Sequence, residues 1–416
     1  MIELLDPIIK SHNVEISNGL NVHYLEADSN KSQKPTALLL HGFPELSFSW
    51  RKIIPFLAAE GFRVIAPDMR GYGQTLGGGK EFHADISEYR LLNLSTDIIS
   101  LMSSLNLDKI DLLVGHDAGS SVAAVSAIIR PDIFKSLVMM SAPYAGTPNI
   151  NSSLTYEDPI HKELEKLDPP RKHYQWYYST IEANKHMHLE KQELHKFLRA
   201  YYHMKSADWK KNVPYKLNSW NAENLAKMPE YYIMHLNEDM VQSVMPHYPQ
   251  SNCYENWLND QELEVYTNSF LKNSFQPALN WYRCMTSNDL NSDLRIFSGK
   301  KIEVPSCFIA GEKDWGIYQK PGALEIMENN LCLHYKGRHI IQNAGHWVQQ
   351  ENHVDVANTL IDFFKNNNKL LKENSVHFDE FGVVTKEKLQ FKDELNISIV
   401  DLSKKYKSWL EDYMAN

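Results

Sequence analysis

Short apolar runs alternate with longer amphipathic stretches along the first third of the chain. A short apolar run followed by a turn-rich segment is typical of a strand that is buried on both faces of a parallel sheet. Such strands are predicted at residues 36–40, 63–66, 110–114 and 135–140. Because helix-length amphipathic segments separate these runs, we expect an α/β fold in which helices cover a mainly parallel sheet.

The pattern changes after Ala142-Pro143-Tyr144. Residues 156–289 are rich in Tyr, Trp, His, Lys and Glu, follow helical spacing and contain few strand-like runs. Strands return at 304–310 and 338–342, and a long helix is predicted at 348–364. We therefore expect a sheet that is interrupted by an inserted helical cap and is completed after it.

These changes of pattern give the expected domain boundaries. The core is predicted at 1–144 and 291–366, the helical cap at 145–290 and a C-terminal extension at 367–416. In the extension, apolar residues recur at steps of three and four, which predicts one amphipathic helix docked on the main domain. Its apolar positions are Ile399, Leu402, Tyr406, Trp409, Leu410 and Tyr413.

Composition narrows the class of partner. Of the 416 residues, 43% are hydrophobic, which is enough to bury a sizeable core. A net charge of -9 without a basic stripe argues against a nucleic-acid partner and favours a neutral or apolar small molecule. Four cysteines without C-x-x-C spacing fit a reducing compartment. Since the chain shows neither a signal peptide pattern nor an apolar run of roughly 18 residues, we expect a cytoplasmic protein without a membrane span.

The first candidate for chemistry is Asp117. Gly115-His116-Asp117-Ala118-Gly119 lies between the predicted strand at 110–114 and an apolar helix at 120–129. A G-x-nucleophile-x-G segment in that position forms a tight turn that lifts its central side chain above the sheet. A carboxylate there can displace a leaving group from saturated carbon and form an alkyl ester that water cleaves. Asp is also a common helix N-cap, so this motif alone leaves both roles open.

Three further segments supply partners for such a nucleophile. His41-Gly42-Phe43-Pro44 follows the strand at 36–40, and the backbone N–H groups of Phe43 and Ala118 are predicted to form an oxyanion hole, although a plain turn is the alternative. Asp314 follows the strand at 304–310, and His346 precedes the last long helix. The order nucleophile, acid, histidine is that of the α/β-hydrolase fold. In such a site His346 would activate water, and Asp314 would orient the imidazole of His346.

Together these motifs resemble the epoxide hydrolase branch of the α/β-hydrolases, over residues 19–364. The resemblance implies an α/β-hydrolase fold with a helical cap, an epoxide and water as substrates, no cofactor, and two cap tyrosines that open the ring. Asn280-Trp281-Tyr282-Arg283 matches one family segment and points to Tyr282, and Tyr174-Gln175-Trp176-Tyr177 matches the other and points to Tyr174. Aromatic packing between cap and core is the alternative for both. Ala118 departs from the pattern, because many relatives carry Trp there.

The predicted function is therefore that of a soluble epoxide hydrolase that forms vicinal diols. A haloalkane or haloacid dehalogenase shares the Asp nucleophile but needs halide donors such as Trp, and a non-catalytic ligand-binding protein of this fold usually lacks a catalytic residue. A serine esterase is disfavoured, because Ser120 lies three residues past the tip of the turn. No metal is predicted, because the neighbours of His186, His188 and His195 are those of a solvated helix face.

Overall fold

A mainly parallel eight-stranded sheet organises the protein. The computed structural model describes residues 2–28, 34–153, 158–367, 377–378 and 384–385. The sheet order is β1-β2-β4-β3-β5-β6-β9-β10; β1, β2 and β4 pair antiparallel, and the pairs from β4 to β10 are parallel. The strands are β1 (Lys10–Glu15), β2 (Asn21–Ala27), β3 (Thr36–Leu40), β4 (Arg63–Pro67), β5 (Leu112–His116), β6 (Leu137–Met140), β9 (Ile302–Gly311) and β10 (Cys332–Ile341). The expected α/β-hydrolase sheet is confirmed.

Two pairs of helices cover this sheet. Helices α2 (Leu91–Ser104) and α3 (Ala118–Ile129) pack on each other, and α3 also packs on β5 and β6. Helices α1 (Ile54–Ala59) and α14 (His353–Asn367) pack on each other, with α1 against β4 and α14 against β9 and β10. The short helices α12 (Ala323–Ile326) and α13 (Val348–Glu351) complete this part of the chain. The central strands β3, β5 and β6 are buried along their whole length, as their apolar sequences require.

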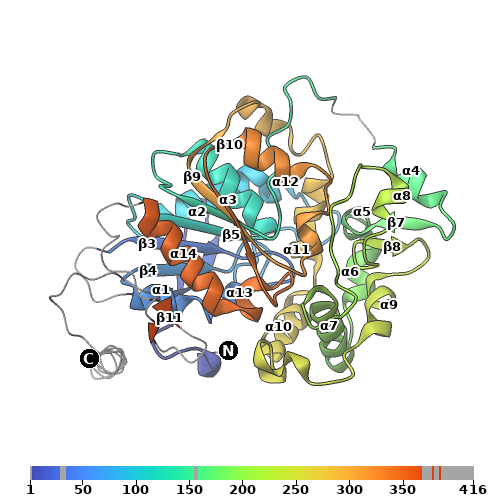
Figure 1. Ribbon diagram of the computed structural model, residues 1–416, viewed down its shortest axis with the longest axis horizontal. Helices are drawn as coiled ribbons and strands as arrows, with labels where there is room; N and C mark the ends of the chain where they lie inside the picture. Colours follow the sequence, from blue (N-terminus) through green and yellow to red (C-terminus); the bar gives the residue numbers. More distant parts are fainter. Residues whose placement is uncertain (1, 29–33, 154–157, 368–376, 379–383, 386–416) are drawn as a thin grey trace.

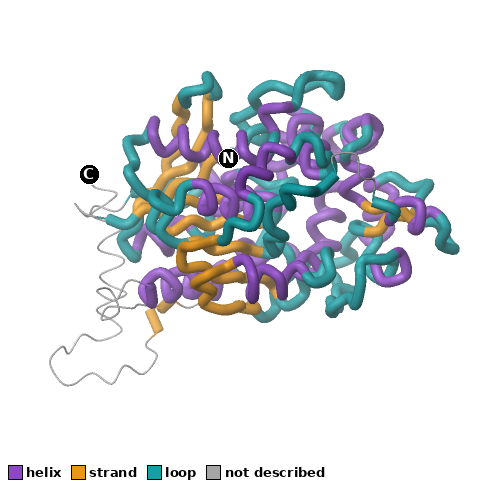
Figure 2. Tube along the Cα trace, turned by 90° about the horizontal axis from the view of Figure 1, so that it is seen from above, coloured by secondary structure: helices purple, strands orange, loops and turns teal. Residues whose placement is uncertain are grey.

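The chain between β6 and β9 is mostly helical and lies together on one side of the sheet, to the right in Figure 1 and again in the view from above in Figure 2. Its elements are α4 (Ile160–Glu165), β7 (Arg171–His173), α5 (Tyr174–Tyr178), α6 (Ile181–Met187), α7 (Lys191–Lys205), α8 (Ala222–Leu225), β8 (Ile233–His235), α9 (Met240–Val244), α10 (Asp260–Asn273) and α11 (Gln276–Met285). Buried residues of this region and of the sheet form one continuous apolar cluster. The two regions are therefore packed as one unit.

Several predicted boundaries need correction. The predicted strand at 110–114 begins and ends two residues later, because Ile110 makes only an isolated bridge to Phe134 while His116 still pairs with β6. The predicted helix at 348–364 is two helices, since Asn352 between them has φ -137° and ψ 67° and leaves the helical conformation. The predicted helix in the C-terminal extension lies outside the described residues. Of that extension the structure describes two short strands, β11 (His377–Phe378) and β12 (Val384–Thr385), which pair with each other.

Candidate active site

Asp117 stands at the sharp turn between β5 and α3. Its backbone has φ 52° and ψ -122°, a conformation that L-residues rarely adopt, and the turn leaves no space for side chains at its two glycines. A Cβ on Gly115 would lie 2.2 Å from the Gly119 carbonyl oxygen, and a Cβ on Gly119 would lie 2.5 Å from the His41 carbonyl oxygen. The glycines thus let β3, β5 and α3 approach closely enough to raise Asp117 above the sheet.

The carboxylate of Asp117 faces groups from two other loops. It occupies the N-cap position of α3 but makes no capping hydrogen bond. Instead, Oδ1 accepts a hydrogen bond from the backbone N–H of Phe43 at 3.2 Å, and Oδ2 lies 3.3 Å from Nε2 of His346. Ala118, the other predicted oxyanion donor, is the first residue of α3, where a backbone N–H has no partner within the helix. A capping role therefore does not account for this side chain.

His346 and Asp314 come together beneath this carboxylate. Nδ1 of His346 lies 3.1 Å from Oδ1 of Asp314, and only 1% of each residue is exposed. The Gly316 backbone N–H donates to the same Asp314 oxygen at 2.7 Å and fixes its direction. Asp314 thus orients the imidazole so that Nε2 points to Asp117, the arrangement of an Asp-His-Asp triad.

Both carboxyl groups favour the ionised form. Burial raises the pKa of Asp117, but the hydrogen bond and charge of His346, helped by Lys205 and His116, outweigh it and hold this pKa well below its usual range. Burial also acts to raise the pKa of Asp314, and the charge and hydrogen bond of His346 lower it further than burial raises it. Asp117 is therefore ionised at neutral pH, as a nucleophile must be.

The helical region holds the loop that carries His346. The His346 backbone N–H donates to the Lys205 carbonyl at the end of α7 at 2.8 Å, and the indole N–H of Trp347 donates to the Tyr202 carbonyl at 2.9 Å. Tyr202 also donates its hydroxyl to the carbonyl of Pro44, beside Phe43, at 2.9 Å. These contacts were not predicted, because a backbone carbonyl leaves no trace in the residue type.

Glu351 secures the same loop from the other side. Its carboxylate accepts backbone N–H bonds from Gly345 at 2.9 Å, Trp347 at 3.0 Å and Ala207 at 2.7 Å. It therefore joins the two residues that flank His346 to the chain that follows α7. Glu351 was also missed from the sequence, where one Glu five residues after a histidine carries no distinctive signal.

A cavity of about 920 Å³ opens above Asp117, and its lining includes Ala118, Tyr174, Tyr282 and Gln319. The rings of Tyr174 and Tyr282 lie 6.0 Å apart between centroids, and Tyr282 also packs edge-on to Phe43 at 5.3 Å. The Tyr174 hydroxyl donates to Oε1 of Gln319 at 3.0 Å. The structure thus brings both predicted tyrosines to the cavity, and adds Gln319 as a partner that the motifs did not reveal.

The two tyrosines remain protonated at neutral pH. Burial raises the pKa of Tyr282 well above 10, and the charge of Asp117 raises it further. Burial and the charge of Asp117 act in the same direction on the pKa of Tyr174. Both hydroxyls can therefore donate hydrogen bonds toward an oxygen held over Asp117.

Two competing candidates do not form sites. Ser120 is fully buried and donates its hydroxyl to the Ala142 carbonyl at 2.9 Å, so it does not face the cavity as a serine nucleophile would. His186 bonds the Tyr177 hydroxyl, whereas His195 bonds Thr267 and lies near acidic groups of α10. Within the described ranges, these histidines do not gather with His188 into a group that could share a metal ion.

Comparisons with known proteins agree with this geometry. The family model for the alpha/beta hydrolase fold matches residues 35–353. Epoxide hydrolase B of Mycobacterium tuberculosis is 29% identical over 373 residues, covering 85% of this chain and 97% of the relative. Epoxide hydrolase 3 of Siraitia grosvenorii is 27% identical over 358 residues, covering 83% and 96%. Among solved structures, an epoxide hydrolase from an endophytic Streptomyces superposes with a TM-score of 0.70 at 25% identity, covering 88% of this chain and 97% of the other. The resemblance inferred from the motifs is confirmed.

The helices were also compared with the dimensions of a lipid bilayer. In the part of the chain that the structure describes, none combines the length and the apolar character that a membrane-spanning helix needs.

Proposed function

Because this chain belongs to the alpha/beta hydrolase fold family, we propose that it is an epoxide hydrolase that converts an epoxide and water to a vicinal diol through an ester on Asp117. The observation that carries the proposal is the placement of an ionised carboxylate at the tip of the β5–α3 turn, with His346 on one side and two tyrosines across the cavity. The similarity to enzymes named epoxide hydrolases supports this chemistry.

In the first step, Oδ2 of Asp117 attacks one epoxide carbon and the C–O bond of the ring breaks. The electron pair stays on the ring oxygen, which takes a proton from Tyr174 or Tyr282. Oδ1 keeps its bond to the Phe43 N–H and becomes the carbonyl oxygen of the new ester. Because Tyr174 already bonds Gln319, the epoxide oxygen has to replace that partner to use both hydroxyls.

In the second step, water attacks Cγ of the Asp117 ester. His346 accepts the water proton at Nε2 while Asp314 stabilises the imidazolium at Nδ1. The backbone N–H groups of Phe43 and Ala118 stabilise the oxyanion, a contribution worth about 10²- to 10³-fold per donor in comparable sites. Collapse restores the carboxylate and releases the diol, and the proton on His346 returns to the tyrosine, so the overall reaction consumes only epoxide and water.

We further propose that residues 145–290 act as a cap domain on the core at 1–144 and 291–366. In this division the cap carries Tyr174 and Tyr282, and the core carries Asp117, Asp314 and His346. The cytoplasmic location remains a prediction from the sequence. The dehalogenase alternative has less support, because Ala118 next to the nucleophile supplies no halide donor and two tyrosines, which suit an epoxide oxygen, line the same cavity.

Trapping the intermediate tests the proposal. His346→Gln should still open the ring but not cleave the ester, so intact-mass spectra after incubation with styrene oxide should gain the full substrate mass. His188→Gln, on an exposed histidine, is the matched control and should form diol without a lasting adduct. In wild-type protein, a single turnover in heavy-oxygen water should label the Asp117 carboxylate. Diol formation with the label absent from position 117 would refute the ester mechanism, and halide release from a haloalkane without diol formation would favour the dehalogenase.

A further inference from the structure

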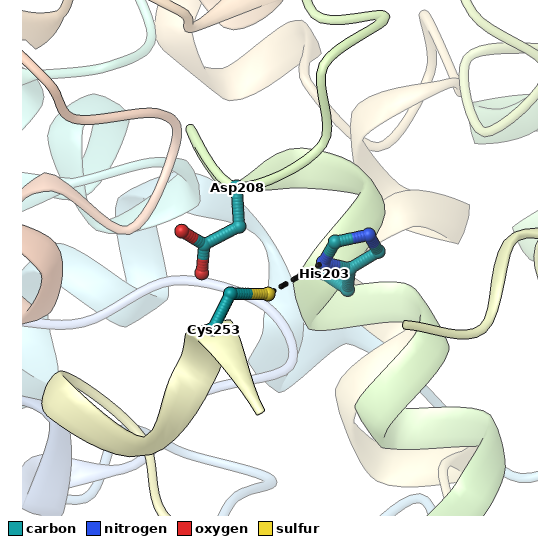
Figure 3. Close-up of side chains that lie close together, drawn as sticks. All are labelled: His203, Asp208 and Cys253. Carbon is teal, nitrogen blue, oxygen red and sulfur yellow. Dashed lines mark hydrogen bonds between the residues drawn. The ribbon is translucent and has the colours of Figure 1, made fainter. Parts of the chain in front are cut away.

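A second group of reactive side chains lies outside the cavity. His203 belongs to the last turn of α7, Asp208 to the loop that follows, and Cys253 to the first position of the 3-10 helix η5 (Cys253–Asn256). Figure 3 shows the three side chains converging from these separate segments, with the Asp208 carboxylate beside Cys253. One ligand atom from each residue lies within 4.8 Å of the others, and Sγ of Cys253 is 4.0 Å from Nδ1 of His203.

The spacing fits a tetrahedral metal ion closely. With Zn–S near 2.3 Å and Zn–N near 2.0 Å, tetrahedral geometry places sulfur and nitrogen about 3.5 Å apart. The observed 4.0 Å therefore has to shrink by a few tenths of an ångström. Cys253 is partly exposed and sits in a single short turn, so a small side-chain rotation can supply this change.

Neighbouring groups orient the Asp208 carboxylate and neutralise the charge of Arg199, the nearest cationic side chain on α7. The Trp257 indole N–H donates to Oδ2 of Asp208 at 2.7 Å, the kind of outer contact that orients a metal-binding carboxylate. Arg199, one turn before His203 on α7, could repel a metal ion. Its guanidinium, however, bonds the carboxylate of Asp260 at 2.9 Å and the carbonyl of Leu258 at 2.7 Å, so its charge is already engaged.

We propose that Cys253, His203 and Asp208 form a zinc site, with Sγ, Nδ1 and a carboxylate oxygen as ligands and water in the fourth position. A thiolate, an imidazole and a carboxylate are the ligand types that Zn²⁺ accepts, and two negative ligands balance its charge. Binding displaces the thiol proton of Cys253 to solvent, and no redox step is involved.

The proposed zinc site lies apart from the reaction at Asp117. None of its three residues lines the cavity above Asp117. A bound ion would connect the end of α7 to η5, and α7 ends at Lys205, whose carbonyl holds the backbone of His346. Zinc would therefore stabilise the segment on which the catalytic loop rests, without entering the reaction.

Cobalt substitution tests the site with a signal that requires sulfur. Titrating the metal-free full chain with Co²⁺ should give one equivalent of binding and a thiolate-to-cobalt charge-transfer band in the near ultraviolet, and added Zn²⁺ should bleach it. Cys253→Ser should abolish the band. Asp208→Asn keeps an acceptor for Trp257 and should weaken binding at least tenfold. His188→Gln controls for exposed histidines and should leave the titration unchanged.

A chemical measurement gives an independent check. Zn²⁺ should slow alkylation of Cys253 by iodoacetamide, followed on the Cys253 peptide, and a chelator should restore the rate. Zn²⁺ should also raise the melting temperature of wild type but not of Cys253→Ser. A band that persists in Cys253→Ser, or alkylation unaffected by saturating Zn²⁺, would overturn the proposal. Each readout is independent of epoxide hydrolysis, so failure of one proposal leaves the other intact.

Discussion

Replacing Glu351 with Ala should separate the two chemical steps. The carboxylate accepts three backbone N–H bonds, two of them from the residues on either side of His346. Burial raises the pKa of Glu351 to about 8, against the lowering by its backbone N–H donors, so the carboxyl group is largely uncharged at neutral pH. A hydrogen bond without a charged partner contributes about 1 kcal/mol, so we expect the free energy of unfolding to fall by about 3 kcal/mol when three such bonds are lost.

The kinetic effect should be larger and selective. Without Glu351 the loop at 345–347 loses its bonds at Gly345 and Trp347, while the backbone of His346 keeps its contacts with Lys205, His116 and Ser141. A displacement of His346 by about 1 Å can cost on the order of 10²-fold in rate. His346 takes the proton of the hydrolytic water, so ester hydrolysis should slow by about this factor. Ring opening should change less, because His346 contributes to that step only by lowering the pKa of Asp117.

Rapid quenching and intact-mass spectrometry can follow both steps in a single turnover. Glu351→Ala should accumulate alkylated protein, and urea unfolding should report the lost stability. Asn352→Ala is the matched control, because its side chain bonds Gln342 and Asp355 instead of the catalytic loop. Equal slowing of ring opening and hydrolysis would show that Glu351 does not act by positioning His346.

Three other changes have distinct expected outcomes. Tyr282→Phe removes one proton donor and should slow ring opening by about 10²-fold, with ester hydrolysis unchanged in single-turnover measurements. Ala118→Trp should fill part of the cavity, so kcat/KM should fall at least about tenfold for trans-stilbene oxide but little for propylene oxide; an equal fall for both would contradict this steric account. Burial raises the pKa of Asp68, but its bond to His23 outweighs burial and lowers the pKa to about 2. The ionised carboxylate stabilises the fold at pH values above its unfolded pKa, near 4, and this contribution is lost as the pH falls toward 2. Asp68→Asn should therefore be less stable than wild type by about 2 kcal/mol at pH 7, and urea unfolding should show this difference vanish in acid. A difference in stability that does not depend on pH would refute the assignment.

The sequence predicted those parts of the fold in which one local pattern decides the structure. The strand at 36–40 was placed with its observed bounds, since five apolar residues buried on both faces allow no other interpretation. Strand β1, by contrast, was missed, because Lys10–Glu15 lies at the sheet edge and is mostly exposed and polar. The break at Asn352 was also missed, since the apolar pattern runs on through both helices.

The same distinction applies to the candidate site. Asp117, Asp314 and His346 follow strands or precede a helix in a recognisable order, and the structure brings them within hydrogen-bonding distance. Their assigned roles stay predictions until the adduct is tested. Lys205 contributes through its backbone and Glu351 through contacts with loops far along the chain, so neither has a local signature.

One helix supports both halves of the proposed reaction. Tyr202 reaches the loop of Phe43, and Lys205, three residues later on the same face of α7, holds the loop of His346. In a chimaera whose residues 145–290 come from a relative, a different helix would therefore contact the loops of His346 and Phe43, and the substrate pocket would change as well. Domain exchange in this protein should preserve the rotation and register of α7 against the sheet. Otherwise a change in substrate specificity will be accompanied by a change in kcat.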